Sequence, residues 1–229
     1  MRTYPGKVRE IRIDLMGQAA AWISCPKQVI PSPGRYLWAS YPGAIWGTPL
    51  FLERTLEDGF LAAPPAPSSW EPGDVLSLCG PLGRGFKLPL STRRLVLASL
   101  TPGAARLLPL AEQAIRLGAE VALYCDFPLP ELPSALEASP LSDLPEAMDW
   151  ADYLALDLPL EQLPLLREYL RSDNRNLTIP PGQVLLSSDI PCGGRAECGV
   201  CAIKTRRGWK LICEDGPVFE LDEVWDNTV

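Results

Sequence analysis

The sequence of 229 residues contains no histidine. This absence excludes a Ser-His-Asp triad, a cysteine–histidine pair and any metal site with an imidazole ligand. A Rieske centre, in which two histidines hold one iron, is excluded for the same reason. The chemistry of this chain must come from other residue types.

Positive charge is also scarce. The chain has 21 lysines and arginines against 28 aspartates and glutamates, a net charge of -7. Because binding a phosphate backbone requires clustered lysine and arginine, we expect no nucleic-acid partner. The densest basic group, Lys204, Arg206 and Arg207, is explained by a solvated hairpin tip.

Long apolar runs are missing as well. No uninterrupted apolar stretch reaches the length of a membrane span. The first residues carry Arg2, Lys7, Arg9 and Arg12, but no apolar segment follows them as it would in a secretion signal. We therefore expect a cytoplasmic protein with no membrane partner.

The sequence does contain a group of cysteines near its C-terminus. Four of the seven cysteines follow the spacing Cys-x5-Cys-x2-Cys-x11-Cys, namely Cys192, Cys198, Cys201 and Cys213. A [2Fe–2S] cluster requires four thiolates, and the plant-type spacing is Cys-x4-Cys-x2-Cys with a distant fourth cysteine. Gly193, Gly194 and Gly199 allow backbone amides to turn toward the sulfurs. The spacing favours a [2Fe–2S] cluster, with a first gap one residue longer than usual.

Two other uses of the cysteines compete with a cluster. Zinc also binds four thiolates, but usually through two Cys-x2-Cys pairs, and only Cys198 and Cys201 form such a pair. Disulfides are disfavoured because cytosolic thiols stay reduced. A zinc-stabilised scaffold without redox function therefore stays open as an alternative. We expect Cys25, Cys79 and Cys125, scattered singly, to be buried unreactive thiols.

Residues 183–224 resemble the iron–sulfur domain of dihydroorotate dehydrogenase electron transfer subunits. Residues 213–219 match the family's Cys-x-Asp-Gly-Pro-Val-Phe element throughout. The loop from Cys192 to Cys198 is one residue longer than the family's Cys-Gly-x-Gly-x-Cys element. The resemblance implies a flavin-containing catalytic partner, in the family a dihydroorotate dehydrogenase subunit, joined through the cluster side.

Residues 7–89 read as short strands separated by proline and glycine, which suggests a small β-barrel. Expected strands are residues 8–13, 21–24, 36–39, 50–53, 59–62 and 75–78. Residues 33–36, 72–74 and 80–86 resemble segments of the family's flavin-binding barrel. Its flavin motif, close to Arg-Pro-x-Ser/Thr, corresponds to residues 48–51, which keep the proline but lack the cation. The resemblance makes FAD possible, and a barrel kept only as a scaffold is the alternative.

In residues 91–180 the pattern of short strands gives way to a strand, a helix and a second strand. This order predicts a β-α-β unit with a parallel sheet. An apolar strand at residues 95–98 precedes Thr101, a candidate helix cap, a helix over residues 104–117 ending at Gly118, and a strand at residues 121–124. In the family, the turn after the first strand is glycine-rich and receives the nicotinamide dinucleotide. Residues 99–106 keep one glycine, so side chains stand where bare backbone should approach a pyrophosphate. We expect no productive NAD binding.

The remainder of this region gives weaker signals. The proline-rich residues 128–164 predict a surface connection. Where relatives have a Cys-Gly-Pro segment, this chain has only residues 156–159, followed by helix-like residues 161–171.

The sequence therefore predicts an α/β plus β-barrel protein in three parts. Residues 1–90 form a flavin-binding-like barrel, residues 91–180 a degenerate NAD-binding-like domain and residues 181–229 a cluster-binding domain. The expected function is an accessory electron-transfer subunit, not an independent catalyst. It would relay electrons through the cluster to or from a flavoenzyme, as in pyrimidine biosynthesis. A cluster-only relay for another oxidoreductase is a further alternative.

Overall fold

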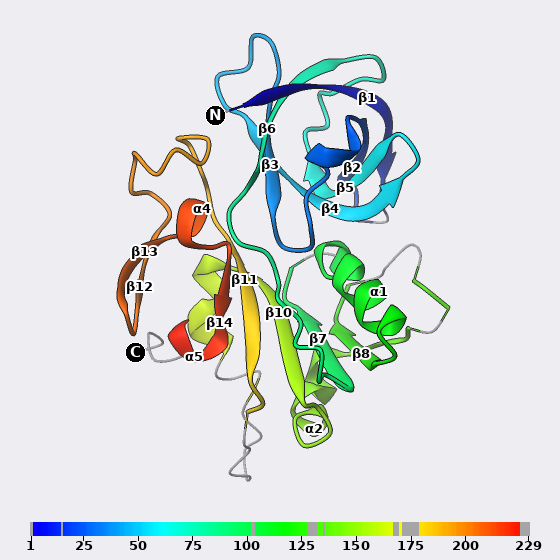
Figure 1. The fold of residues 1–229 in the computed structure, drawn as a ribbon, viewed down its shortest axis with the longest axis vertical. Coiled ribbons are helices and arrows are strands. Elements are labelled where there is room, and N and C mark those ends of the chain that lie inside the picture. The colour runs from blue at the N-terminus through cyan, green and yellow to red at the C-terminus, as the bar shows by residue number, and fades with distance from the viewer. Residues whose placement is uncertain are drawn as a thin grey trace.

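The structure is a computed structural model that describes residues 2–14, 16–101, 104–127, 132–134, 136–166, 170 and 179–224. A β-barrel lies at one end of the molecule and a mostly parallel sheet at the other. The C-terminal segments pack along one side of both (Figure 1). The predicted combination of a barrel with an α/β sheet is confirmed.

The barrel is closed by six antiparallel strands in the order β1-β2-β5-β4-β3-β6. The strands are β1 (Thr3–Ile13), β2 (Ala19–Ser24), β3 (Tyr36–Ser40), β4 (Thr48–Leu56), β5 (Gly59–Ala66) and β6 (Val75–Leu82), with a short 3-10 helix η1 (Lys27–Val29) before β3. Alternate residues of each strand fill the barrel interior, among them the fully buried Ile23, Leu37 and Phe60. Every strand predicted in this region is present.

The second sheet has the order β14-β11-β10-β7-β8-β9. Its strands are β7 (Arg94–Ser99), β8 (Glu120–Cys125), β9 (Ala138–Ser139), β10 (Tyr153–Pro159), β11 (Gly182–Ser187) and β14 (Val218–Glu220). All pairs are parallel except β11 with β14. The central strands β7 and β10 are buried on both faces, as in a parallel sheet covered from both sides.

The connection from β7 to β8 forms the helix of the predicted β-α-β unit. A 3-10 turn, η2 (Ala104–Arg106), leads into α1 (Leu108–Arg116), and Pro109 lies in its first turn, where a missing N–H costs nothing. Gly118 follows the helix with φ +83° and ends it. Thr101 is not the helix cap, because Leu107 occupies that position and the Thr101 hydroxyl binds Asp157 instead.

The proline-rich region contributes to the core, contrary to the expected surface connection. After β9 come η3 (Leu141–Asp143) and α2 (Leu144–Ala147), whose leucines Leu141 and Leu144 are buried against the sheet. The helix-like residues 161–171 begin as the 3-10 helix η4 (Leu160–Leu165). Leu166 and Leu170 are helical and buried, whereas residues 167–169 and 171 lie outside the described residues.

The C-terminal segments combine a hairpin with a return to the large sheet. The hairpin is β12 (Ala202–Thr205) with β13 (Gly208–Leu211), followed by α4 (Ile212–Asp215), β14 and α5 (Leu221–Val224). Lys210 Nζ lies 3.2 Å from Glu223 Oε1, which fixes the hairpin to α5. Both β11 and β14 belong to the six-stranded sheet, so the cysteine-bearing part is continuous with that sheet. Among the described residues, no helix combines the length and the apolar character needed to cross a membrane.

Candidate metal centre

The four predicted cysteines come from two segments that the fold brings together. Cys192 and Cys198 lie in the irregular loop after β11, Cys201 directly precedes β12, and Cys213 lies in α4. The Ile212 amide donates a hydrogen bond of 3.0 Å to the Cys201 carbonyl, which joins the two segments next to two of the thiols. Cys201 and Cys213 are buried, Cys192 is half-buried and Cys198 is exposed.

The four thiols form two neighbouring pairs. Cys198 lowers the pKa of Cys192, and Cys201 raises the pKa of Cys213, so the members of each pair lie close together. Cys192 also raises the pKa of Cys213, so the two pairs are neighbours. Within the part of the chain that the structure describes, no three cysteine, aspartate or glutamate side chains surround one point that could hold a single ion.

The loop between Cys192 and Cys198 turns its backbone amides toward sulfur. Gly193, Gly194 and Ala196 have positive φ angles of 67°, 79° and 60°. Successive residues of this kind create a concave surface of N–H groups. The backbone amides of Glu197, Arg195 and Cys198 lower the pKa of Cys192, and that of Ala196 lowers the pKa of Cys213. The loop therefore brings several of its amides close to these two sulfurs.

The electrostatics differ between the two pairs. Burial raises the pKa of Cys192, but the bonds from backbone amides and from Cys198 outweigh it and lower the pKa to about 6. Burial and the neighbouring Cys201 raise the pKa of Cys213 to about 12. The buried pair therefore needs a nearby positive charge, such as a metal, before both of its thiols ionise.

Strand β3 of the barrel forms the wall behind these cysteines. Tyr36 is fully buried, and its hydroxyl donates a 3.1 Å hydrogen bond to the Cys213 carbonyl. A Cβ atom on Gly194 would lie 2.8 Å from the Tyr36 hydroxyl oxygen, and one on Gly193 would lie 2.9 Å from Trp38 Nε1. Sequence reasoning missed Tyr36 and Trp38. The available signal was alternation, because Leu37 and Ala39 point into the barrel and their aromatic neighbours point out of it.

Residues 80–86, which resemble a family segment, connect the barrel to the second cysteine segment. Arg35 Nε donates to the Gly83 carbonyl at 3.1 Å. The Arg84 amide donates to the Gly216 carbonyl, and Arg84 Nη2 lies 3.7 Å from Asp215 Oδ1. This connection fixes the position of Cys213 relative to the barrel.

A cleft of about 690 Å³ separates the barrel from the carboxyl ends of the parallel strands. Thr48, Pro49 and Phe51, at the position of the family's flavin motif, line one side of the cleft. Thr101 and Arg106, from the turn that receives the dinucleotide in the family, line the other. The structure therefore places both degenerate motifs at one cavity.

A buried ion pair closes the sheet side of this cleft. Arg106 Nε lies 2.8 Å from Asp157 Oδ2, and Arg106 Nη2 lies 2.8 Å from Asp157 Oδ1. Burial raises the pKa of the Asp157 carboxyl, and the contacts with Arg106 and Thr101 oppose this shift. The Arg106 guanidinium also lies 5.3 Å from the centre of the Phe51 ring. Sequence reasoning missed this pair, although an acidic residue inside the apolar run of residues 153–158 was a signal.

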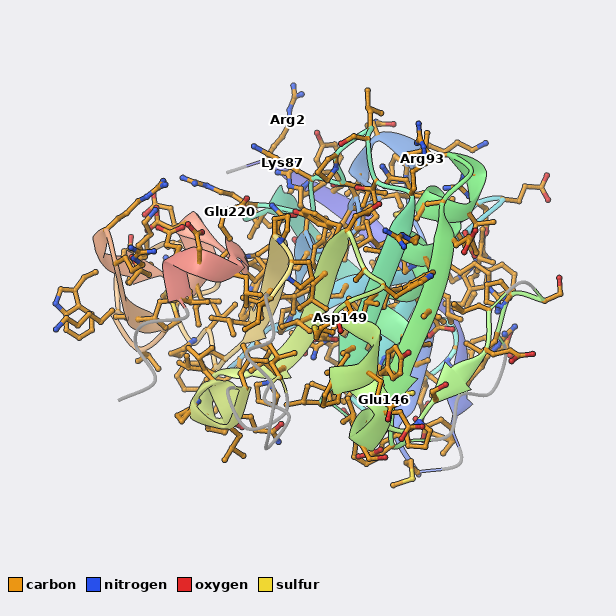
Figure 2. All side chains as sticks on the ribbon, turned by 90° about the horizontal axis from the view of Figure 1, so that it is seen from below. Arg2, Lys87, Arg93, Glu146, Asp149 and Glu220 are labelled. Atoms are coloured by element: carbon orange, nitrogen blue, oxygen red, sulfur yellow. The ribbon has the colours of Figure 1, made fainter. Side chains whose placement is uncertain are left out.

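The three remaining cysteines lie outside the candidate metal centre, and Glu220 is held by a hydrogen bond within the large sheet. Cys125 is buried as expected, whereas Cys25 and Cys79 are half-buried. Burial, followed by the nearby Asp58, raises the pKa of Cys25 to about 11, which keeps it a thiol. Glu220, labelled in Figure 2 beside the C-terminal helices, accepts a 2.6 Å hydrogen bond from Gln183.

The barrel and the parallel sheet have a ferredoxin-reductase-like fold, and the cysteine segments extend its sheet. Residues 192–225 match the family described as the iron-sulfur cluster binding domain of dihydroorotate dehydrogenase B. A curated relative, the electron transfer subunit of dihydroorotate dehydrogenase B (NAD(+)) from Desulforamulus reducens, is 28% identical over 185 residues. The match covers 69% of each chain. The predicted resemblance to this family of electron transfer subunits is confirmed.

Solved structures support the fold. The NADH-dependent reduced ferredoxin-NADP oxidoreductase superposes with a TM-score of 0.75 at 20% identity, covering 97% of this chain and 91% of that one. A ferredoxin NADP+ reductase from Neisseria gonorrhoeae superposes with a TM-score of 0.52 at 12% identity, covering 82% and 98%. At these identities the likeness concerns the fold alone.

The packing of the cysteine loop on β3 gives a testable prediction. Gly194→Ala adds a methyl group 2.8 Å from the Tyr36 hydroxyl and 2.9 Å from Leu82 Cδ1, at a φ of 79°. Gly17→Ala, at a φ of 75° with nothing within 4 Å, carries only the backbone strain and is the matched control. Overpacking should lower the free energy of unfolding of Gly194→Ala by about 1–3 kcal/mol more than that of the control. Urea denaturation measures both, and equal losses would contradict the packing described.

Proposed function

We propose that this protein is an electron-transfer subunit that relays single electrons through one [2Fe–2S] cluster. Cys192, Cys198, Cys201 and Cys213 would hold the cluster. The observation that carries this proposal is the meeting of the two cysteine segments. The Ile212 amide binds the Cys201 carbonyl, and both Gly194 and the Cys213 carbonyl lie against the Tyr36 hydroxyl. A [2Fe–2S] cluster binds four thiolates in total, two on each iron.

The spacing of the thiols and the loop between them support a cluster better than a zinc ion. Zinc sites with four cysteines usually have two Cys-x2-Cys pairs, and here only Cys198 and Cys201 form one. The positive-φ loop of Gly193, Gly194 and Ala196 brings backbone amides close to the Cys192 and Cys213 sulfurs. Amides near sulfur stabilise charge on a cluster and tune its potential. When bound, the cluster would supply one-electron redox chemistry, and the residues of this chain hold it and shape its environment.

The difference in burial among the four cysteines indicates from which side a redox partner can approach the proposed cluster. Cys201 and Cys213 lie buried near Tyr36, while Cys198 and the following Val200 face solvent. The side of Cys198 is therefore where a partner can come closest to the cluster. Electron relay needs no general acid or base, and it is compatible with a chain that has no histidine.

We further propose that the partner is a flavin-containing oxidoreductase subunit of the dihydroorotate dehydrogenase type, the enzyme that the curated relative's name contains. This chain would then be an accessory subunit in pyrimidine biosynthesis, not an independent catalyst. A cytoplasmic location would keep its thiols reduced.

A docking face for that partner surrounds the exposed side of the site. Ile45 is 88% exposed, Trp46 64% and Val200 56%. Gly47 and Gly193 both pack on the Trp38 indole, so the loop carrying Ile45 and Trp46 is a neighbour of the cysteine loop. In Figure 1 the two loops rise on the same side of the molecule. Exposed aromatic and aliphatic side chains next to a redox site are suited to a protein partner.

Metal and sulfide analysis of anaerobically purified protein tests the proposed function. We expect about two iron and two acid-labile sulfide per chain, with visible absorption that fades on reduction. A colourless protein containing about one zinc per chain would instead establish the zinc-stabilised scaffold. A cluster in a protein that neither binds nor reduces a dihydroorotate dehydrogenase would favour a relay for another oxidoreductase.

Substitution of single cysteines tests the ligand assignment. Cys201→Ser removes one proposed ligand and should abolish most of the visible absorption and labile sulfide. Cys125→Ser, the control, alters a buried thiol in β8 and should leave both unchanged. Absorption spectra and sulfide assays of the two variants decide the matter. Retention of colour by Cys201→Ser with loss from Cys125→Ser would show that the assignment is wrong.

The docking face gives a separate prediction. Trp46→Ser should weaken binding to a co-expressed dihydroorotate dehydrogenase catalytic subunit by roughly 10-fold or more, because central aromatic side chains dominate interface energies. Leu90→Ser is the control, since Leu90 is 81% exposed but lies before the amino end of β7, whereas the cysteine loop follows the carboxyl end of the parallel strand β11. Isothermal titration calorimetry measures the dissociation constant of each variant for the catalytic subunit. Equal effects of the two substitutions would place the partner elsewhere.

A further inference from the structure

The ion pair between Arg106 and Asp157 lies where a dinucleotide-binding fold receives phosphate. Strands β7 and β10 are neighbours, and Ser99 at the end of β7 pairs in register with Asp157 in β10. Arg106 lies in the first turn after β7. Ligands of open α/β sheets bind at the carboxyl ends of the strands, with phosphates at the turn that follows the first strand.

Arg106 is already paired with a carboxylate of the protein itself. Its Nε donates a 2.8 Å hydrogen bond to Asp157 Oδ2, and its Nη2 lies 2.8 Å from Asp157 Oδ1. One face of the guanidinium lies over the Phe51 ring. The Arg106 side chain is 10% exposed and the Asp157 side chain 0%. A phosphate at this arginine would lie beside a buried carboxylate that already neutralises its charge.

The rest of the cleft provides no second positive charge that could bind an anion. Among the described residues that line it, Arg106 is the only lysine or arginine, and Glu161 and Asp189 add negative charge. Thr101, whose hydroxyl lies 3.4 Å from Asp157 Oδ2, also belongs to the internal network. The described residues therefore do not fit the doubly charged pyrophosphate of FAD or NAD.

We propose that the Asp157 carboxylate takes the place of a bound phosphate, so that the cleft is closed to dinucleotides and the protein carries no flavin of its own. A buried ion pair that loses one partner is strongly destabilised. The exchange of Asp157 for an external pyrophosphate is therefore unfavourable as long as the carboxylate is present. Electrons would then pass between the proposed cluster and a partner without an intermediate flavin in this chain.

The proposal predicts that removing the carboxylate creates an anion site. In Asp157→Asn, the amide keeps the size of the side chain but leaves Arg106 with an unpaired charge. Inorganic pyrophosphate and ADP should then bind at least 10-fold more tightly than to the wild-type protein at low ionic strength. They should also raise the melting temperature of this variant but not that of the wild type.

The double variant Asp157→Asn/Arg106→Met is the matched control. It removes both charges, so it should unfold at a higher temperature than Asp157→Asn and should show no shift with pyrophosphate. Isothermal titration and thermal unfolding, with pyrophosphate, ADP and FAD as probes, measure all three proteins. An equal response of the double variant to pyrophosphate would show that Arg106 is not the anion site.

Two results would overturn the proposal. One is saturable, stoichiometric FAD binding by the wild-type protein, and the other is a folded Asp157→Asn variant that gains no affinity for pyrophosphate. If Asp157→Asn does not fold, the FAD titration of the wild type decides alone, and the absence of binding supports the proposal. Iron and sulfide content is measured separately, so failure here is distinguishable from failure of the proposed cluster.

Discussion

The architecture of the candidate metal centre depends on one contact, the packing of Tyr36 from the barrel against both cysteine segments. Its hydroxyl binds the Cys213 carbonyl, and the same hydroxyl oxygen would lie 2.8 Å from a Cβ atom at position 194, which is a glycine. Neither cysteine segment is long enough to build a hydrophobic core of its own. The two strands of the hairpin and the helices α4 and α5 have four residues each. The barrel therefore acts as the wall on which the thiols assemble, and its stability and that of the site are coupled.

The same barrel contributes to the cleft, and there its role is different. Phe51 lies beside the Tyr36 ring, with centroids 5.7 Å apart, and on its other side contacts the guanidinium of Arg106. A continuous row of buried groups thus leads from Cys213 through Tyr36 and Phe51 to the Arg106–Asp157 pair. The cleft of about 690 Å³ between the barrel and the parallel sheet stays open, and the Arg106–Asp157 pair closes its sheet side.

Much of the fold could be predicted from the sequence, because short alternating strands and one amphipathic helix follow directly from local patterns. Pro109 at the start of α1 and Gly118 at its end behave as their chemistry requires. Strand β10 was missed, because its buried run contains the charged Asp157, whose partner Arg106 is distant in sequence. The proline-rich region was misjudged for a related reason, since Leu141 and Leu144 are buried by tertiary contacts that no local pattern reveals.

Spacing and resemblance name four cysteines as cluster ligands, and that assignment stays a prediction. The contributions of Tyr36 and Trp38 could not be predicted, because they depend on how the barrel meets the C-terminal segments. The extra residue in the cysteine loop also could not be interpreted from sequence alone. In the structure, Ala196 of this loop adopts a φ of 60°, and its backbone amide lowers the pKa of Cys213.

The most direct test of the central claim is electron paramagnetic resonance of the anaerobically purified protein before and after reduction. A [2Fe–2S] cluster held by these cysteines should be silent when oxidised and should show about one unpaired electron per chain when reduced. A protein that shows no such spin after reduction, or that holds zinc in place of iron, would contradict the account.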